Sequence, residues 1–161
     1  MRYVISIGAN LGSAQTIVAD AIEDMAALMD GELVAASSLY RTSPVSDVEQ
    51  PDYINAVTIV ESPLEPLEAL RVLQSMEDRA DRVRDVRWGP RTLDLDIVTV
   101  DAVVSDDPVL TLPHPHAHER AFVLIPWLEI EPDAALPGHG KVRNVVDGGF
   151  EGQEIERVEP R

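Results

Sequence analysis

The segment RWGPRTLDLDIVTV, residues 87–100, joins an arginine-rich loop to an apolar strand that contains two aspartates. Because side chains alternate between the two faces of a strand, three apolar residues are expected on one face and three polar residues on the other. The apolar face holds Leu93, Leu95 and Ile97, and the polar face holds Thr92, Asp94 and Asp96. The β-carbons of the two aspartates then lie about 7 Å apart, from a rise of ~3.3 Å per residue. Their carboxylates could share one cation or bridge two, or they could face solvent from an edge strand.

Arginines gather just before this strand. Of the 13 Lys and Arg residues, five fall between positions 79 and 91: Arg79, Arg82, Arg84, Arg87 and Arg91. The planar guanidinium donates two parallel hydrogen bonds to phosphate oxygens. Hard oxygen ligands without thiolates favour magnesium over zinc. An arginine cluster beside an acidic metal site therefore suits a polyphosphate with bound magnesium, although a solvated loop paired with nearby aspartates is the alternative, and Arg79 could serve the helix dipole.

Apolar periodicity predicts the other elements. Strands are expected at 2–8, 32–42, 53–61 and 92–100, and helices at 14–30 and 67–82. The order strand, helix, strand, strand, helix, strand is the split βαβ, ferredoxin-like pattern of an α+β fold, an antiparallel sheet with both helices on one face. Residues 101–113 suggest a hairpin or a short extra strand, and residues 116–130 mix a turn of helix with an apolar run. We expect one domain over residues 1–147 and a frayed C-terminal tail over residues 148–161.

Length and composition limit the class of protein. The chain has 161 residues, 45% of them hydrophobic, which suits a single packed domain. The net charge of -16 argues against a nucleic-acid binder. No apolar run reaches the ~18 residues of a membrane span, and the chain has no cysteine to form disulfides or thiolate zinc sites. A soluble cytoplasmic protein is the expectation.

Three smaller patterns could bind ligands. Tyr53 and Asn55 share a strand face and could stack on and hydrogen-bond a planar heterocycle, or they could be ordinary strand residues. Gln74 and Glu77 share a helix face and could contact a ligand or only water. The sequence HPHAH, residues 114–118, superficially suggests a metal site, but its prolines indicate a loop. The segment GANLG lacks the P-loop and Rossmann spacings.

Together these motifs resemble the 6-hydroxymethyl-7,8-dihydropterin pyrophosphokinase family of folate biosynthesis. The resemblance covers about residues 3–147 and is carried by IGANLG (7–12), YRTSPV (40–45), EQPDYINAV (49–57), RVRDVRWGPRTLDLDI (82–97) and LPHPHAHERAFVLIPWLEIEP (112–132). It implies a monomeric αβα three-layer sandwich with a ferredoxin-like βαββαβ core. The implied enzyme uses ATP and two magnesium ions, transfers pyrophosphate to the pterin hydroxymethyl group and releases AMP.

The resemblance also implies roles for individual residues. Asp94 and Asp96 would hold both magnesium ions, and Arg82 and Arg91, on mobile loop segments, would stabilise the transferring phosphates. The implied ATP site comprises Gln74, Glu77, Arg84, Ile97, Thr111, His114 and Arg120. The implied pterin site comprises Thr42, Val45, Tyr53, Asn55, Trp88 and Phe122.

The chain departs from the family pattern at Ala9, Ser13, Ser43, Ser46 and Val109. These positions put nucleotide affinity and loop shape in question rather than the chemistry. Two other functions stay open on the residues alone. One is a different phospho- or nucleotidyl-transferase with a DxD motif, and the other is a non-catalytic module that binds magnesium and nucleotide.

Overall fold

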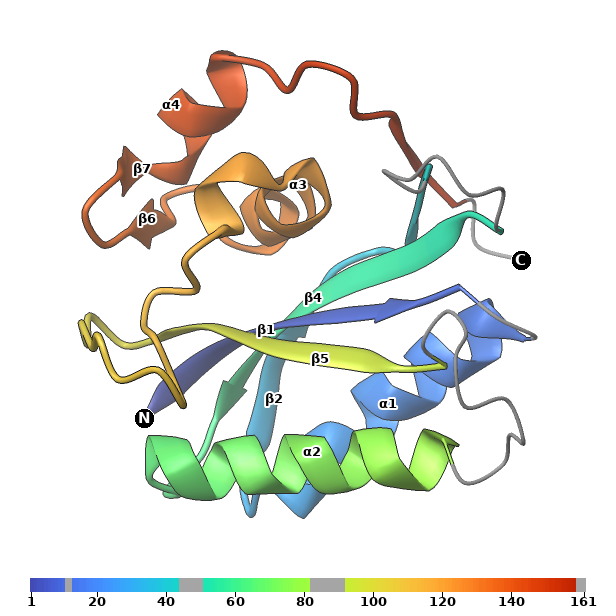
Figure 1. The fold of residues 1–161 in the computed structure, drawn as a ribbon, viewed down its shortest axis with the longest axis vertical. Helices are drawn as coiled ribbons and strands as arrows, with labels where there is room; N and C mark the ends of the chain where they lie inside the picture. The colour runs from blue at the N-terminus through green and yellow to red at the C-terminus, as the bar shows by residue number, and fades with distance from the viewer. Residues whose placement is uncertain (11–12, 44–50, 82–91, 159–161) are drawn as a thin grey trace.

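The computed structural model describes residues 1–10, 13–43, 51–81 and 92–158. One antiparallel sheet forms the centre of the molecule, with strand order β5-β1-β4-β3-β8 and with β2 also paired to β4 (Figure 1). Its strands are β1 (Arg2–Ala9), β2 (Glu32–Ala36), β3 (Tyr40–Thr42), β4 (Tyr53–Glu61), β5 (Asp94–Val100) and β8 (Ile155–Arg157). The helices are α1 (Ala14–Leu28), α2 (Pro66–Asp81), α3 (Ala121–Ile130) and α4 (Val142–Asp147), with a 3-10 turn η1 (Ala117–Glu119) and a small hairpin of β6 (Ala135–Leu136) and β7 (Gly140–Lys141).

The predicted ferredoxin-like core is confirmed in element order and layering. Helices α1 and α2 cover one face of the sheet, and α3 and α4 lie over the other, giving the three-layer sandwich (Figure 1). The prediction of a single strand over residues 32–42 is wrong in one respect, because the structure has two strands there, β2 and β3. The register of β2 on β4 shifts between Leu33 and Ala35, and the Ser37 hydroxyl accepts a hydrogen bond from the Val57 N–H at the interruption.

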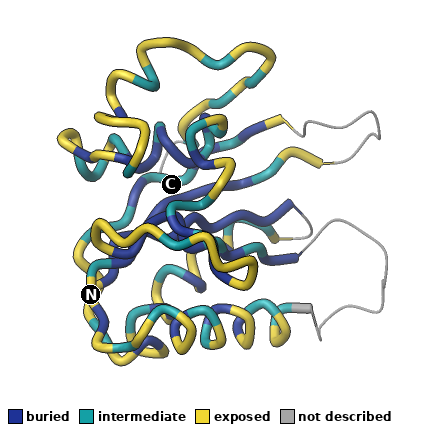
Figure 2. The backbone as a smooth tube through the Cα atoms, turned by 60° about the vertical axis from the view of Figure 1, so that its left-hand side comes forward, coloured by how far each residue is buried: buried dark blue, intermediate teal, exposed yellow. Residues whose placement is uncertain are grey.

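Two apolar cores follow from the alternation of side chains across the sheet, and the buried residues are concentrated in its strands (Figure 2). The core under α1 and α2 contains Leu93, Leu95 and Ile97 of β5 and the adjoining loop, each at most 4% exposed. The core under α3 surrounds Trp127, which is 1% exposed. Burial of Leu93, Leu95 and Ile97 confirms the face assigned to them and turns Asp94 and Asp96 towards α3.

Helix α3 is the element that the sequence predicted least well. Residues 121–130 were expected to be an apolar run after a turn of helix, whereas they form a ten-residue helix with Pro126 inside it. The sheet and α4 both pack on α3, so the side chains of this helix are apolar on most of its sides. The sequence therefore shows no amphipathic stripe that would mark these residues as a helix. After β5, where a hairpin or a short extra strand was expected, the structure has one isolated antiparallel bridge between Ser105 and Leu112.

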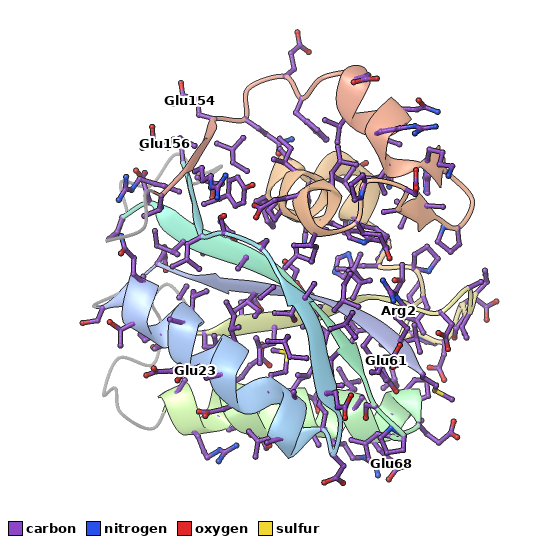
Figure 3. All side chains as sticks on the ribbon, turned by 180° about the vertical axis from the view of Figure 1, so that it is seen from behind. Arg2, Glu23, Glu61, Glu68, Glu154 and Glu156 are labelled. Atoms are coloured by element: carbon purple, nitrogen blue, oxygen red, sulfur yellow. The ribbon has the colours of Figure 1, made fainter. Side chains whose placement is uncertain are left out.

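The expected frayed C-terminal tail is wrong for the residues that the structure describes. Residues Ile155–Arg157 form β8, which pairs with β3 in register from Thr42–Ile155 to Tyr40–Arg157. Figure 3 shows Glu156 on this strand and Glu154 just before it, at the opposite end of the molecule from Glu61 and Glu68. The sequence missed β8 because its residues are mostly polar and its pairing partner lies more than 110 residues away.

None of the helices in the described ranges is both long and apolar enough to cross a membrane.

One polar contact joins α3 to the β2–β3 connection. The Glu129 carboxylate accepts hydrogen bonds from the Tyr40 hydroxyl and from the Ser38 N–H, the latter at 3.0 Å to Oε2. Burial opposes ionisation of Glu129, but these hydrogen bonds and the nearby Arg157 outweigh it, so its pKa lies below the usual 4.5. Burial, followed by the contact with Glu129, raises the pKa of Tyr40 to about 12.

This arrangement predicts a stability that depends on pH. A carboxylate whose folded pKa is depressed stabilises the fold above its unfolded pKa, and the effect is lost as the pH falls through the folded pKa. We expect Glu129→Gln to lower the free energy of unfolding by about 1 kcal/mol at neutral pH, discounted for the exposure of the side chain. Urea unfolding at neutral pH and at about pH 3 should show the difference from wild type disappearing in acid. Glu151→Gln, at an exposed position, is the control. An equal difference at both pH values would contradict the assignment.

Candidate active site

A cavity of about 540 Å³ lies on the α3 side of the sheet. Strands β1, β3, β4 and β5 supply one wall, and the start of α3 and the segment before β8 supply the other. The described residues that line it are Ser6, Gly8, Thr42, Ser43, Tyr53, Asn55, Asp94, Asp96, His116, Glu119, Arg120, Ala121, Phe122, Gln153, Glu154 and Ile155. Seven of the predicted site residues therefore meet in one place: Thr42, Tyr53, Asn55, Asp94, Asp96, Arg120 and Phe122.

The aspartates come from the edge strand β5. Asp94 is paired with Gly8 and Asp96 with Ser6 on the neighbouring strand β1. Both carboxylates are half-buried and point into the cavity, because their apolar neighbours occupy the opposite face of β5. Strand pairing thus holds the two acidic groups two residues apart on one rigid surface.

Asn55 reaches the cavity because Gly8 lies opposite it. A β-carbon at Gly8 would come within 2.9 Å of the Asn55 Oδ1 atom, so a larger residue would displace the amide. The Asn55 Nδ2 group donates a hydrogen bond of 2.7 Å to the Thr42 hydroxyl oxygen, and both side chains are buried. Tyr53, two residues earlier on β4, adds a half-buried ring to the same wall. This wall offers a flat ring and oriented amide and hydroxyl groups.

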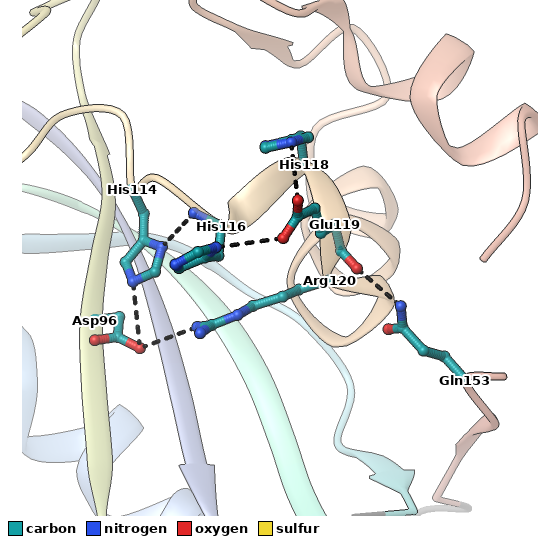
Figure 4. A network of polar contacts seen from close by, with 7 residues as sticks. All are labelled: Asp96, His114, His116, His118, Glu119, Arg120 and Gln153. Atoms are coloured by element: carbon teal, nitrogen blue, oxygen red, sulfur yellow. Dashed lines mark hydrogen bonds and ion pairs between the residues drawn. The ribbon is translucent and has the colours of Figure 1, made fainter. Parts of the chain in front are cut away.

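Arg120 lies between the acidic wall and an aromatic ring, just before α3. Its Nη1 atom is 3.7 Å from Asp96 Oδ2 (Figure 4), and its Cζ atom is 5.5 Å from the centre of the Phe122 ring. A guanidinium in this place is attracted by the carboxylate and by the face of the ring. The same positive group therefore borders the acidic and the aromatic parts of the cavity.

His114 lies beside Asp96, and the contact between them is the dashed line from its ring in Figure 4. Burial, with the nearby positive Arg120 and then His116, lowers the pKa of His114 to about 4, so its ring is neutral near pH 7. Its Nδ1 atom accepts a hydrogen bond of 3.2 Å from the His116 N–H, which leaves the proton on Nε2. That nitrogen is 4.0 Å from Asp96 Oδ2, too far for a hydrogen bond (Figure 4). The ring therefore presents a neutral donor at the edge of the site.

Other predicted ligand residues lie away from this cavity. Glu77 accepts a hydrogen bond of 2.9 Å from the Leu95 N–H at the outer edge of β5, and Gln74, one helical turn earlier on α2, is exposed. Ile97 is 3% exposed in the core below α1 and α2, so only its main chain could reach a ligand. The Thr111 hydroxyl donates to the Asp107 carbonyl at 3.0 Å. Arg82, Arg84, Arg91, Val45 and Trp88 lie outside the described residues.

The sequence missed several residues that line the cavity. His116 and Glu119 were not assigned, and their ring nitrogen and carboxylate lie 3.3 Å apart. Gln153, Glu154 and Ile155 belong to the segment expected to be a tail. No local pattern marks them, because their place beside Arg120 and Thr42 depends on the pairing of β8 with β3.

The donor chemistry of the cavity fits magnesium. Four of its described lining residues are carboxylates, Asp94, Asp96, Glu119 and Glu154, against the single guanidinium of Arg120. A polyphosphate would be repelled from this surface unless cations accompanied it. No cluster of three or more His, Asp or Glu residues in the described chain forms a closed metal cage. Magnesium usually binds one or two carboxylates and completes its shell with water and substrate phosphates, which Asp94 and Asp96 allow.

Comparison with known proteins places this chain in a family. A family model described as 7,8-dihydro-6-hydroxymethylpterin-pyrophosphokinase (HPPK) matches residues 4–132. The chain is 38% identical over 158 residues to 2-amino-4-hydroxy-6-hydroxymethyldihydropteridine pyrophosphokinase of Methylorubrum extorquens, covering 98% of this chain and 99% of the relative. The enzyme of that name from Mycobacterium bovis is 42% identical over 157 residues, covering 89% of this chain and 80% of the relative.

Solved structures agree on the fold. The crystal structure of wild-type Plasmodium falciparum HPPK-DHPS with pteroate matches with a TM-score of 0.68 at 13% sequence identity. The match covers 91% of this chain and 42% of that one, so this chain spans less than half of the Plasmodium protein. The activity shared by this family model and these relatives is the transfer of pyrophosphate from ATP to 6-hydroxymethyl-7,8-dihydropterin in folate biosynthesis. The chain therefore belongs to the 7,8-dihydro-6-hydroxymethylpterin-pyrophosphokinase family.

Proposed function

We propose that this chain carries out the family's pyrophosphate transfer in the cavity between β5 and the start of α3. The observation that carries the proposal is the meeting of two kinds of wall in one cavity, an acidic one made by Asp94 and Asp96 and a polar aromatic one made by Tyr53, Asn55 and Phe122. A reaction between a metal-bound polyphosphate and a planar alcohol requires both walls within reach of one reacting centre.

The pterin binds against β4 and the start of α3. Tyr53 and Phe122 stack on the ring, because both are half-buried and leave ring surface towards the cavity. Asn55 and Thr42 hydrogen-bond the edge of the heterocycle, and their mutual hydrogen bond sets the direction of the remaining donors and acceptors. By family resemblance Val45 and Trp88 close around the ring.

ATP would bind along the acidic wall, where Asp94 and Asp96 would hold two magnesium ions. When bound, magnesium supplies the positive charge that offsets the phosphates and the carboxylates. Arg120 binds a phosphate after leaving Asp96, and His114 donates from Nε2. By family resemblance Arg82, Arg84 and Arg91 bind the phosphates, while Gln74, Glu77, Ile97 and Thr111 surround the rest of the nucleotide; Ile97 acts through its main chain.

In the reaction the hydroxymethyl oxygen of the pterin bonds to the β-phosphorus of ATP. The bond from that phosphorus to the oxygen bridging the α- and β-phosphates breaks, and AMP leaves with the bridging oxygen. The hydroxyl proton is released during the transfer. The chain's contribution is positioning and charge stabilisation, because this chemistry needs no covalent nucleophile. We propose that the enzyme works as a monomer in the cytoplasm, where ATP is available.

The product distinguishes this reaction from the other candidates. The protein is incubated with ATP, magnesium and 6-hydroxymethyl-7,8-dihydropterin, and the nucleotides are separated. We expect AMP, formed only when the pterin is present. ADP would indicate transfer of a single phosphoryl group by another kind of DxD enzyme, and no turnover would indicate a binding module.

Asp96 tests the metal assignment. We expect Asp96→Ala to lower kcat/KM by at least about 100-fold, since changes to groups that only support metal ligands already cost 10–100-fold. Its thermal unfolding midpoint should stay close to that of wild type. Asp106→Ala removes the same charge from an exposed position beyond β5 and is the matched control. Wild-type turnover in Asp96→Ala would remove Asp96 from the metal site.

Phe122 tests the stacking assignment. Replacing this ring with leucine keeps an apolar side chain but loses the aromatic face, which contributes about 0.5–1.5 kcal/mol. We therefore expect Phe122→Leu to weaken pterin binding about 2- to 10-fold in fluorescence titrations. Phe150→Leu, which alters the α3 core without touching the cavity, is the control. Equal pterin affinity in the two variants would contradict stacking on Phe122.

A further inference from the structure

The segment before β8 contacts both walls of the cavity. On the sheet side, Ile155 is paired with Thr42, and the Glu154 carbonyl accepts a hydrogen bond of 3.4 Å from the Ser43 N–H. On the helix side, Gln153 contacts the main chain where η1 meets α3. Three consecutive residues therefore connect the wall that carries Thr42 to the wall that carries Phe122.

The Gln153 side chain forms hydrogen bonds with the main chain on both sides of Arg120. Its Nε2 group donates a hydrogen bond of 2.8 Å to the Glu119 carbonyl (Figure 4), and its Oε1 atom accepts one of 3.0 Å from the Ala121 N–H. These are the main-chain groups on either side of Arg120. One amide thus satisfies a carbonyl and an N–H, as a neighbouring strand would.

The start of α3 needs such a partner. The first N–H groups of a helix have no acceptor within the helix, and the N-cap residue here, Arg120, makes no side-chain cap bond. Gln153 supplies the acceptor for Ala121 from 32 residues further along the chain. The direction in which the chain enters α3, and hence where Arg120 and Phe122 point, therefore depends on a residue outside the helix.

We propose that Gln153 is a positioning residue of the pyrophosphokinase site, which holds Arg120 and Phe122 at their working distance from the sheet wall of the cavity. This inference rests on the proposed placement of the pterin between Tyr53 and Phe122. Gln153 acts through the main chain and through β8, so the strength of pterin binding depends on how firmly the C-terminal strand joins α3 to β3.

The test removes both side-chain hydrogen bonds while keeping the length of the side chain. Pterin affinity is measured by fluorescence titration of wild type and Gln153→Met, with magnesium and a non-hydrolysable ATP analogue, at a temperature where both are fully folded. We expect Gln153→Met to weaken pterin binding about 2- to 10-fold, which corresponds to the net free energy of about one hydrogen bond. We also expect kcat to fall, because Arg120 is displaced as well. Gln15→Met, the same change on α1 across the sheet, should bind as wild type does.

Binding separates positioning from stability alone. If Gln153→Met unfolds at a lower temperature but binds the pterin with wild-type affinity and turns over normally, the proposal is overturned. If Gln153→Met does not fold, Gln153→Glu carries the test, since it keeps the acceptor for Ala121, loses the donor to Glu119 and adds a negative charge at that carbonyl; unchanged pterin affinity in this variant would also overturn the proposal. Wild-type protein that does not bind the pterin would refute the proposed pterin site, and the inference with it. Absence of pterin binding is seen with the wild-type protein alone, so it is distinguished from a failure of the Gln153 proposal, which only the variants reveal.

Discussion

In the sheet, Asp94 of β5 is paired with Gly8 of β1, and Gly8 is paired in turn with Asn55 of β4. This row across three antiparallel strands brings an acidic group and an amide onto one face, with a residue between them that has no side chain. A shift of one residue in either pairing would turn one of them into the opposite core. The site therefore depends on the register of the sheet, which the apolar residues of the same strands maintain by their burial under α1 and α2.

The charged groups of the cavity connect its acidic wall with its aromatic wall. Its described lining holds more carboxylates than cations, so the acidic wall suits a polyphosphate only together with metal ions. Arg120 lies beside Asp96 and over the Phe122 ring at the same time. In the function proposed above, a cation bound at Asp96 would replace Arg120 there and leave it to bind phosphate. The acidic protein surface, with a net charge of -16, does not oppose this chemistry, since the local groups determine what binds.

Segments far from β5 in the sequence complete the site. Helix α3 is attached to the β2–β3 connection through Glu129 and to the C-terminal segment through Gln153. Both contacts join the helix that carries Phe122 to strands that carry the opposite wall. The width of the cavity is thus a property of the whole sandwich, and it is not contained in any one motif.

The sequence by itself determined the strands β1, β4 and β5, the helices α1 and α2, and the face on which Asp94 and Asp96 lie, because strand and helix periodicity are local properties that burial enforces. It also predicted that Thr42, Tyr53, Asn55, Arg120 and Phe122 belong to one site, through resemblance of motifs. Only the tertiary structure decided that α3 is a helix, that residues 155–157 are a strand, and that Gln153 reaches the main chain beside Arg120. These features depend on partners 32 to 117 residues away, whose contacts satisfy backbone groups that no local pattern reports.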